Sequence, residues 1–485
     1  MTPAESYSSP RRGQSRAFFL EKAVIFHFAT LLIFTSWAFG GQVPWAREVI
    51  AIWGGLGVLL FFACSHACKA PAKWFHPAMR WLWPLLFYDL LVGVSGLNPS
   101  FARIPGGGEA ELVMIHPLTW LPSSALPVLT WKELWQFNII VLTCFNLAVV
   151  LHSRRMVRMV LMIVTGNAAI LAVFGTFQKL TGSTALWFGA VPSPNPKFFS
   201  TFVYHNHWGA FTVLNTAVCL GLLTHLIRRN TGRPFWHTPI PLVAIVVLLL
   251  AISVPLSASR SCTALMAALL FGALIHLLVG LFRRRRRNRR SIVVPLAGIL
   301  VVAALSLGAI YYVGQDVIAQ RAQLTSEQIA SIAREDTLNS RLTLYRDTWR
   351  MAAEKPWFGW GLESYAHVFR IFNTQRAIES WVWIPFYAEA HNDWLQSLAE
   401  VGFIGTGLLG LMVLFPLMSV SWRQVSSSLP RYLLAGCGLI LLYAWVEFPF
   451  ANPTVMISFW CCLYSAVRYA KLSGNEQNTP AAPHE

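Results

Sequence analysis

Hydrophobic residues along this chain gather in long unbroken runs, not in short segments of alternating polarity. A helix needs about 20 apolar residues to cross the hydrocarbon core of a bilayer, whereas barrel strands are shorter and alternate. The pattern therefore predicts an all-α polytopic membrane protein with about twelve transmembrane helices. Runs that meet the criterion lie at 23–40, 48–65, 81–97, 132–151, 159–178, 202–227, 238–257, 262–282, 291–313, 394–420, 431–449 and 453–470.

One long polar segment, 314–393, separates the ninth predicted span from the tenth. Residues 317–335 lack Gly and Pro and predict a helix. In 341–354 an amphipathic helix is predicted, because apolar positions recur at steps of three and four residues: Leu342, Tyr345, Trp349 and Ala352 or Ala353. The charged Arg341, Asp347 and Arg350 then lie on its other faces. We therefore expect a folded helical loop and not a flexible tether.

Composition supports the membrane class, because 55% of the residues are hydrophobic and only 12% are charged, against about one quarter in soluble domains. The first span is too long for a signal peptide and predicts an uncleaved helix. The predicted organisation is an N-terminal tail at 1–22, transmembrane helices 1–9 within 23–313, the loop 314–393, helices 10–12 within 394–471, and a polar tail at 472–485.

The net charge of +17 raises the question of a nucleic-acid partner. Basic residues, however, fall at alternate connections between spans, as the positive-inside bias requires. Among them are Arg11 and Arg12, Arg154 and Arg155, Arg228 and Arg229, and the run 283–287. We interpret the charge as a topology signal and expect no nucleic acid partner, both tails in the cytoplasm, and the loop 314–393 outside.

The eight cysteines show no zinc spacing and no disulfide framework, and none lies in the outer loop. Buried structural thiols are the expected state of Cys64, Cys144, Cys219, Cys262, Cys437, Cys461 and Cys462, with Cys68 close by on the cytoplasmic side.

Lys197, His205, Asn206 and His207 open the sixth span on its outer side. The two histidines are two residues apart and would point to different faces of a helix, which is poor geometry for a shared metal ion. These residues therefore indicate hydrogen bonding to a polar ligand, the alternative being an interfacial belt.

Arg260 follows the seventh span at the outer boundary. A guanidinium there matches a phosphate or diphosphate in a bidentate manner, although it also reaches lipid headgroups readily. Near the end of the chain, Glu447 lies in a tight outer hairpin between the last two spans, where we expect it to position an acceptor or support the structure.

Several of these pieces, in this order and topology, resemble the O-antigen ligase and O-antigen polymerase superfamily of bacterial membrane glycosyltransferases. The matching pieces are Ser200 to Phe202, Asn206-His207, Ser259-Arg260, Arg341 with Trp349, Pro356 to Gly361, His391-Asn392 and Glu400-Val401-Gly402. Several members carry an arginine before the asparagine of the sixth span, where this chain has His205.

The resemblance implies a GT-C-like fold in the bacterial inner (cytoplasmic) membrane with its active site facing the periplasm. It implies transfer of an undecaprenyl-diphosphate-linked glycan to a lipid A core or glycan acceptor, as in lipopolysaccharide synthesis, without a metal or other cofactor.

Departure of a diphosphate requires cations near the developing charge, and attack by a sugar hydroxyl requires a base. On this chemistry Arg260 and Arg341 are the candidates for the diphosphate. His391 is the candidate base, since imidazole titrates near neutrality, with Asn392 to orient its ring; the alternative for His391 is a polar helix cap. Direct attack would invert the anomeric carbon.

Ligation of O-antigen to the lipid A core is the favoured reaction, and three alternatives stay open. Two lie in the same class: an O-antigen or exopolysaccharide polymerase and a protein O-oligosaccharyltransferase. The third is an anion transporter, because Asp89 and Glu400 fall inside predicted spans. Against transport, the sequence shows no internal repeat and no paired broken helices.

Overall fold

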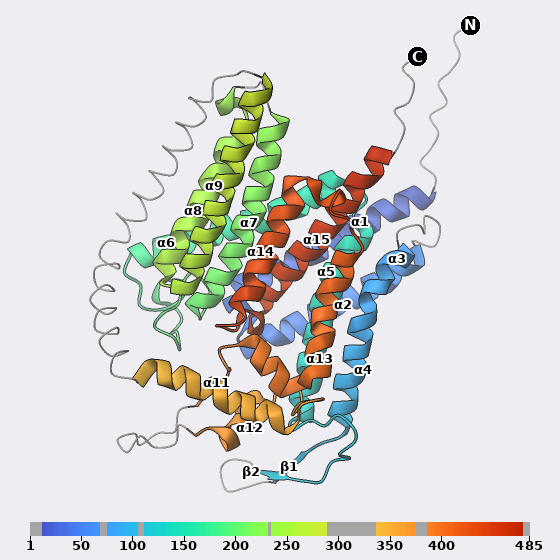
Figure 1. The fold of residues 1–485 in the computed structure, drawn as a ribbon, viewed down its shortest axis with the longest axis vertical. Coiled ribbons are helices and arrows are strands. Elements are labelled where there is room, and N and C mark those ends of the chain that lie inside the picture. The colour runs from blue at the N-terminus through green and yellow to red at the C-terminus, as the bar shows by residue number, and fades with distance from the viewer. Residues whose placement is uncertain are drawn as a thin grey trace.

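A computed structural model describes residues 12–67, 75–104, 111–230, 234–288, 336–374 and 386–478. Long helices form a bundle, and one end of the bundle carries α11, α12 and a two-stranded hairpin (Figure 1). Helix α1 begins and helix α15 ends at the opposite end. We call the first of these the α11 end.

The long helices of the described ranges are α1 (Arg12–Trp37), α2 (Pro44–Ala67), α4 (Trp83–Leu97), α5 (Pro127–Val150), α6 (Arg154–Leu180), α7 (His205–Arg229), α8 (Ile240–Ser257), α9 (Arg260–Asn288), α11 (Asp336–Glu354), α13 (Asp393–Met418), α14 (Ser428–Tyr443) and α15 (Pro453–Asn478). The shorter elements are α3 (Phe75–Met79), α12 (Tyr365–Phe372), six 3₁₀ turns at 39–41, 80–82, 187–189, 235–237, 424–426 and 449–451, and strands β1 (Phe101–Ile104) and β2 (Glu111–Met114).

Eight helices of the described residues are long and apolar enough to cross a membrane: α1, α2, α5, α6, α7, α8, α9 and α13. Helices α4, α14 and α15 also coincide with predicted spans, although they are not among these eight. The ninth predicted span, 291–313, and the predicted helix 317–335 lie outside the described residues, so the count of twelve stays a prediction.

Helix α7 lies at the centre of the bundle, with 83% of its most apolar stretch buried by other parts of the protein. Small residues let its neighbours approach closely. A Cβ added at Gly209 would lie 2.5 Å from Cys262 of α9, and one added at Gly221 would lie 2.7 Å from Leu429 of α14. Close packing of this kind is how helices associate where there is no water to drive them together.

A second, smaller core holds the α11 end together. It joins side chains of α11 and α12 to Phe101 and Ala125 of the segment between α4 and α5. The hairpin of β1 and β2 belongs to this segment and pairs antiparallel, Phe101 opposite Met114. The prediction of an all-α protein missed this hairpin, because its short strands are bounded by Pro- and Gly-rich sequence that carries little periodicity.

The turn after α11 comes very close to α13 at its glycines. Gly359 and Gly361 have φ of 68° and 104°, and a Cβ on Gly359 would lie 2.3 Å from the carbonyl carbon of Glu400. Gly402, with φ of 67°, meets Trp357 in the same way. The turn therefore packs backbone to backbone against the middle of α13, whose helical geometry is interrupted at Gly402.

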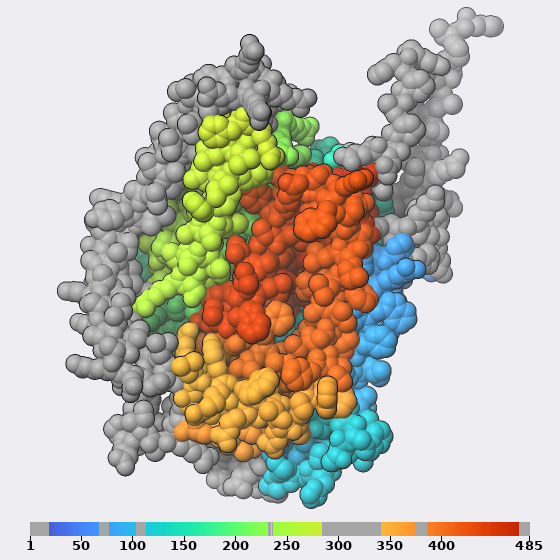
Figure 2. All heavy atoms as spheres, viewed as in Figure 1, coloured from blue at the N-terminus to red at the C-terminus, as the bar shows by residue number. Residues whose placement is uncertain are grey.

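The predicted apolar face of α11 is correct for Ala352, which is buried, and for Tyr345, which packs against the smaller core, but wrong for two other residues. Leu342 and Trp349 are 62% and 50% exposed, whereas Asp347 is fully buried beside Leu344 and Met351. The burial of Asp347 is possible because its Oδ2 accepts hydrogen bonds from the backbone nitrogen and the hydroxyl of Thr374, at 2.8 and 2.7 Å. Figure 2 shows α11 lying across the lower end of the helices α13 and α14.

Candidate active site

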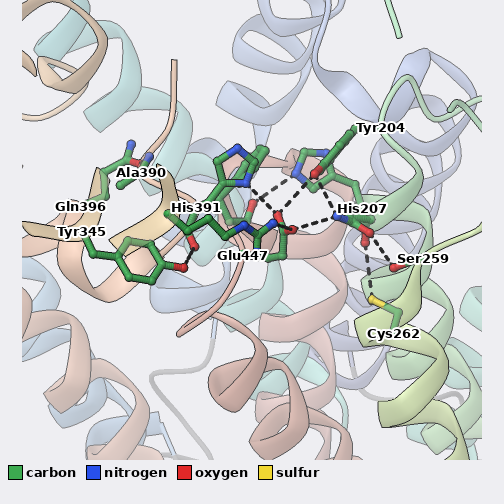
Figure 3. Close-up of polar contacts among 12 residues, drawn as sticks. Tyr204, His207, Ser259, Cys262, Tyr345, Ala390, His391, Gln396 and Glu447 are labelled. Atoms are coloured by element: carbon green, nitrogen blue, oxygen red, sulfur yellow. Dashed lines mark hydrogen bonds and ion pairs between the residues drawn. The ribbon is translucent and has the colours of Figure 1, made fainter. Parts of the chain in front are cut away.

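The carboxyl group of Glu447 is the centre of a polar cluster at the α11 end of the bundle (Figure 3). Glu447 lies in the hairpin between α14 and α15 and is only 4% exposed. Its two oxygens contact side chains from a loop, from the start of α7, from α11 and from the residues before α13. Segments distant in sequence thus meet on one buried acid.

His391 contacts Glu447 through Nδ1, which lies 3.2 Å from Oε2. A carboxylate only accepts hydrogen bonds, so the contact favours the tautomer with the proton on Nδ1 and leaves the lone pair on Nε2. No described residue makes a hydrogen bond to Nε2. The side chain of His391 is 29% exposed, so this nitrogen has an approach from outside.

The backbone of His391 is held in an unusual conformation, with φ of 50°. This left-handed region costs a residue with a side chain about 1–2 kcal/mol and persists where neighbouring contacts fix it. Tyr345 of α11 supplies one such contact, since its hydroxyl donates to the His391 carbonyl at 2.9 Å. Burial raises the pKa of Tyr345, so its hydroxyl remains a donor at neutral pH.

On the α7 side, Asn206 fixes the other oxygen of Glu447. Its Nδ2 donates to Oε1 at 3.0 Å and to the Tyr204 hydroxyl at 2.8 Å, while its Oδ1 accepts from Ser259 at 2.6 Å. The Tyr204 hydroxyl also lies 3.4 Å from Glu447 Oε2. The amide of Asn206 is therefore fully occupied within the protein.

Phe448 packs the aromatic residues of the cluster together. Tyr204 stacks on its ring at 5.3 Å, and the rings of His391 and His207 meet it edge-on at 4.8 and 5.1 Å. Buried His207 spans from the Phe448 carbonyl, 3.1 Å from Nε2, to Gln42, 3.3 Å from Nδ1. His207 thus holds the hairpin of Glu447 against the loop before α2.

Cations lie at the exposed rim of the cluster. Arg341 of α11 places Nη2 3.4 Å from Glu447 Oε1, with its side chain 51% exposed. Arg260 is exposed at the first residue of α9, directly after the Ser259 that binds Asn206. Because Arg341 uses one nitrogen at a long distance, its remaining N–H groups are available to an anion.

The other predicted site residues are placed differently. Lys197 is exposed on the loop before α7 and makes its contact through its carbonyl, which accepts from the His205 nitrogen at 3.1 Å. His205 is half-buried next to Tyr204, with ring centroids 4.9 Å apart. Asn392 caps α13 by accepting from the Leu395 nitrogen at 3.0 Å, so Glu447, and not Asn392, contacts the imidazole.

The sequence analysis did not predict Tyr204, Tyr345 or Phe448 as residues of the site. Each reaches the cluster only through tertiary contact, and the only available signal was their closeness in sequence to His205, Arg341 and Glu447. The described ranges contain no group of three or more His, Cys, Asp or Glu side chains arranged to hold a metal ion, so no metal ligand is assigned.

Seven cysteines are buried and free, which confirms the expectation for them: Cys64, Cys144, Cys219, Cys262, Cys437, Cys461 and Cys462.

The two carboxyl groups predicted inside spans, those of Asp89 and Glu400, have neutral partners. Asp89 accepts from Asn138 Nδ2 at 2.8 Å, and Glu400 accepts from the Tyr365 nitrogen at 3.1 Å.

The apolar helices and the polar cluster at their end define a multi-pass membrane protein with a candidate acid–base site. A buried carboxylate that holds an imidazole by one nitrogen and leaves the other nitrogen open is an arrangement suited to proton abstraction.

Residues 245–410 match the family model described as O-antigen ligase. The match confirms the resemblance to the O-antigen ligase superfamily, and this family implies a glycosyltransferase-like activity on a lipid-linked glycan in a membrane. It runs from within α8 to within α13 and includes Arg260, Arg341 and His391, whereas Asn206 and Glu447 lie outside it. No curated protein matches the chain.

Proposed function

We propose that the protein transfers a glycan from undecaprenyl diphosphate to the lipid A core, with His391 as the base. The observation that carries the proposal is the contact of 3.2 Å between His391 Nδ1 and Glu447 Oε2, which leaves Nε2 to take the proton of an acceptor hydroxyl. The family match supports the substrate class.

In the proposed reaction the acceptor oxygen attacks the anomeric carbon as its proton passes to His391 Nε2. The bond between that carbon and the diphosphate oxygen breaks, and its electron pair leaves with the diphosphate. Arg341 and Arg260 neutralise this charge, while Glu447 stabilises the imidazolium. One direct displacement inverts the anomeric carbon and requires no metal.

The contacts of Asn206 give it a supporting role in place of direct substrate binding. Its amide holds Glu447 from one side and Ser259 from the other. Lys197, on the loop before α7, and His205, at the start of α7, are proposed to contact the substrate, whereas buried His207 acts by holding the Phe448 hairpin in place. We place the site at the periplasmic face of the inner membrane, with 314–393 as the catalytic loop.

Purified protein with an undecaprenyl-diphosphate-linked glycan tests the proposal. Released carrier and product are scored with lipid A core present and with donor alone, for the wild type, His391→Ala and Arg341→Ala. The proposal expects transfer only with the core acceptor and loss in both variants. Chain growth with donor alone identifies a polymerase instead, and carrier release by His391→Ala at the wild-type rate removes the base assignment.

A further inference from the structure

A separate cavity of about 190 Å³ lies beside the start of α13. Asp393 lies in its wall and connects it to the same hairpin, since the Asp393 nitrogen donates to the Ala444 carbonyl at 2.8 Å and Oδ2 accepts from the Phe450 nitrogen at 3.0 Å. Neither His391 nor Glu447 lines the cavity, so the proposed reaction does not account for it.

The wall of this cavity combines acids with aromatic rings. Its carboxyl groups are those of Glu133, Glu363, Glu389, Asp393 and Glu400, and its rings are those of Tyr88, Phe137, Trp394, Phe450, Phe459 and Trp460. Arg47 is the one basic residue of the lining, and its Nη1 is already paired with Glu133 at 2.8 Å. The balance of charge is negative in a protein whose net charge is +17.

Glu389 presents an unused acceptor to this space. The Glu389 side chain is half-buried and lines the cavity. Gln396 Nε2 donates to Oε2 at 2.7 Å, and no described residue donates to Oε1. Because Glu389 lines the cavity, this oxygen is open to a hydrogen-bond donor or a cation there.

The chemistry of the wall selects the donor. Aromatic faces attract a cation that has shed its water, and they are the usual lining of sites for organic ammonium groups. When they are ionised, the surrounding carboxyl groups supply the opposite charge and repel phosphates. A cavity of about 150 Å³ admits benzene, so this one admits a group of similar size.

We propose that the cavity between α13, α15, α5 and α4 binds a small organic ammonium group, held by the Glu389 carboxylate and the surrounding rings. An amine of this kind is presented by a soluble molecule or by the headgroup of a lipid. This proposal does not depend on the proposed glycosyl transfer, and a negative result for that reaction would not contradict it.

The test is calorimetric titration of the full chain at pH 9, above the pKa of about 8 that burial gives Glu389, in dodecyl maltoside, a neutral detergent without amines. Choline is compared with its uncharged isostere 3,3-dimethyl-1-butanol. We expect choline to bind at least tenfold more tightly, and Glu389→Gln to abolish that difference. Glu354→Gln removes the same charge from an exposed position at the end of α11 and is expected to bind choline as the wild type does.

Equal binding of the two compounds, or no binding of choline, overturns the proposal. If Glu389→Gln fails to elute as a folded species, Glu363→Gln provides the second acid variant, with the same expectation. Phosphatidylethanolamine added to the micelles then distinguishes the source. Loss of choline binding identifies a lipid headgroup, and unchanged binding identifies a soluble amine.

Discussion

His391 shows at the scale of one residue how geometry turns an ordinary side chain into a candidate base. A histidine before a helix was visible in the sequence, and so were Arg341 and Glu447. Their meeting was not, because 56 residues separate His391 from Glu447 and 106 separate Arg341 from it. Residue type indicates what chemistry is available, whereas the distance between groups depends on the fold.

Replacing Glu447 by Gln tests whether the carboxylate stabilises the charged imidazole. We expect the rate of carrier release to fall by about 10²–10⁴, because the amide keeps the shape of the contact without its charge. The rate is measured by following free undecaprenyl diphosphate. Glu48→Gln, at an exposed position of α2, serves as control, and a variant rate within twofold of the wild type would falsify the role.

Replacing Asn206 by Asp tests its supporting role. The change places a second carboxyl group against Glu447 Oε1, 3.0 Å from the present nitrogen, where like charges repel. We expect a loss of at least tenfold in the maximal rate with little change in the donor concentration at half-saturation. The opposite pattern would indicate that Asn206 binds the donor directly.

Burial is the main cause, and repulsion from Glu363 the second, of the rise in the pKa of Glu389 to about 8 from 4.5 in an unfolded chain. Arg47 and Glu133 also face it. Between these two values the folded state holds a proton that the unfolded state has lost. Stability is therefore expected to decrease as the pH rises from about 4.5 through 8.

Thermal unfolding from pH 5 to 9 measures this effect, and Glu389→Gln should reduce the decrease because it cannot ionise. Glu354→Gln, which is exposed, should follow the wild-type curve. An unchanged pH dependence in Glu389→Gln would show that other groups cause it.

Helix α11 and the turn after it show what sequence patterns predict at the scale of an element. The turn at Pro356 to Gly361 was predictable, since Pro ends a helix and Gly permits positive φ. The buried face of α11 was not. Apolar spacing selected Leu342 and Trp349, but Asp347 is buried instead, because Thr374 donates two hydrogen bonds to its Oδ2.

A pair of glycine substitutions separates backbone strain from steric contact. Gly182 and Gly359 have similar φ, 70° and 68°, but only Gly359 has neighbours within 4 Å of an added Cβ. We expect Gly182→Ala to lower the free energy of unfolding by about 1 kcal/mol, through backbone strain alone. Gly359→Ala is expected to lower it by roughly 3 kcal/mol, because the backbone of Glu400 cannot easily move away from the added Cβ. The two melting temperatures provide the comparison, and equal decreases would contradict the steric explanation.

For the whole molecule, α11 and the strands lie at one end of the bundle, and α1 begins and α15 ends at the other. The basic residues predict this arrangement, in which the start of α1 and the end of α15 lie opposite α11. From the distribution of basic residues we expect the α11 end to face away from the cytoplasm.

Cysteine labelling tests this orientation. Leu118, at the α11 end, and Trp422, at the other end, are 55% and 91% exposed. In a Cys68→Ser background we expect a membrane-impermeant maleimide to label Leu118→Cys in intact spheroplasts, and Trp422→Cys only after permeabilisation. The seven described native cysteines are buried and should stay silent. The reverse pattern would invert the topology.

The sequence alone determined that this is a helical membrane protein with a polar segment late in the chain, because the cost of placing polar groups in hydrocarbon leaves long apolar runs. It also provided the reactive residue types and the family resemblance. Only the tertiary structure placed Glu447 between His391, Asn206 and Arg341. It also formed the acid-lined cavity beside α13. Such contacts depend on the packing of helices from distant parts of the chain, which no local pattern records.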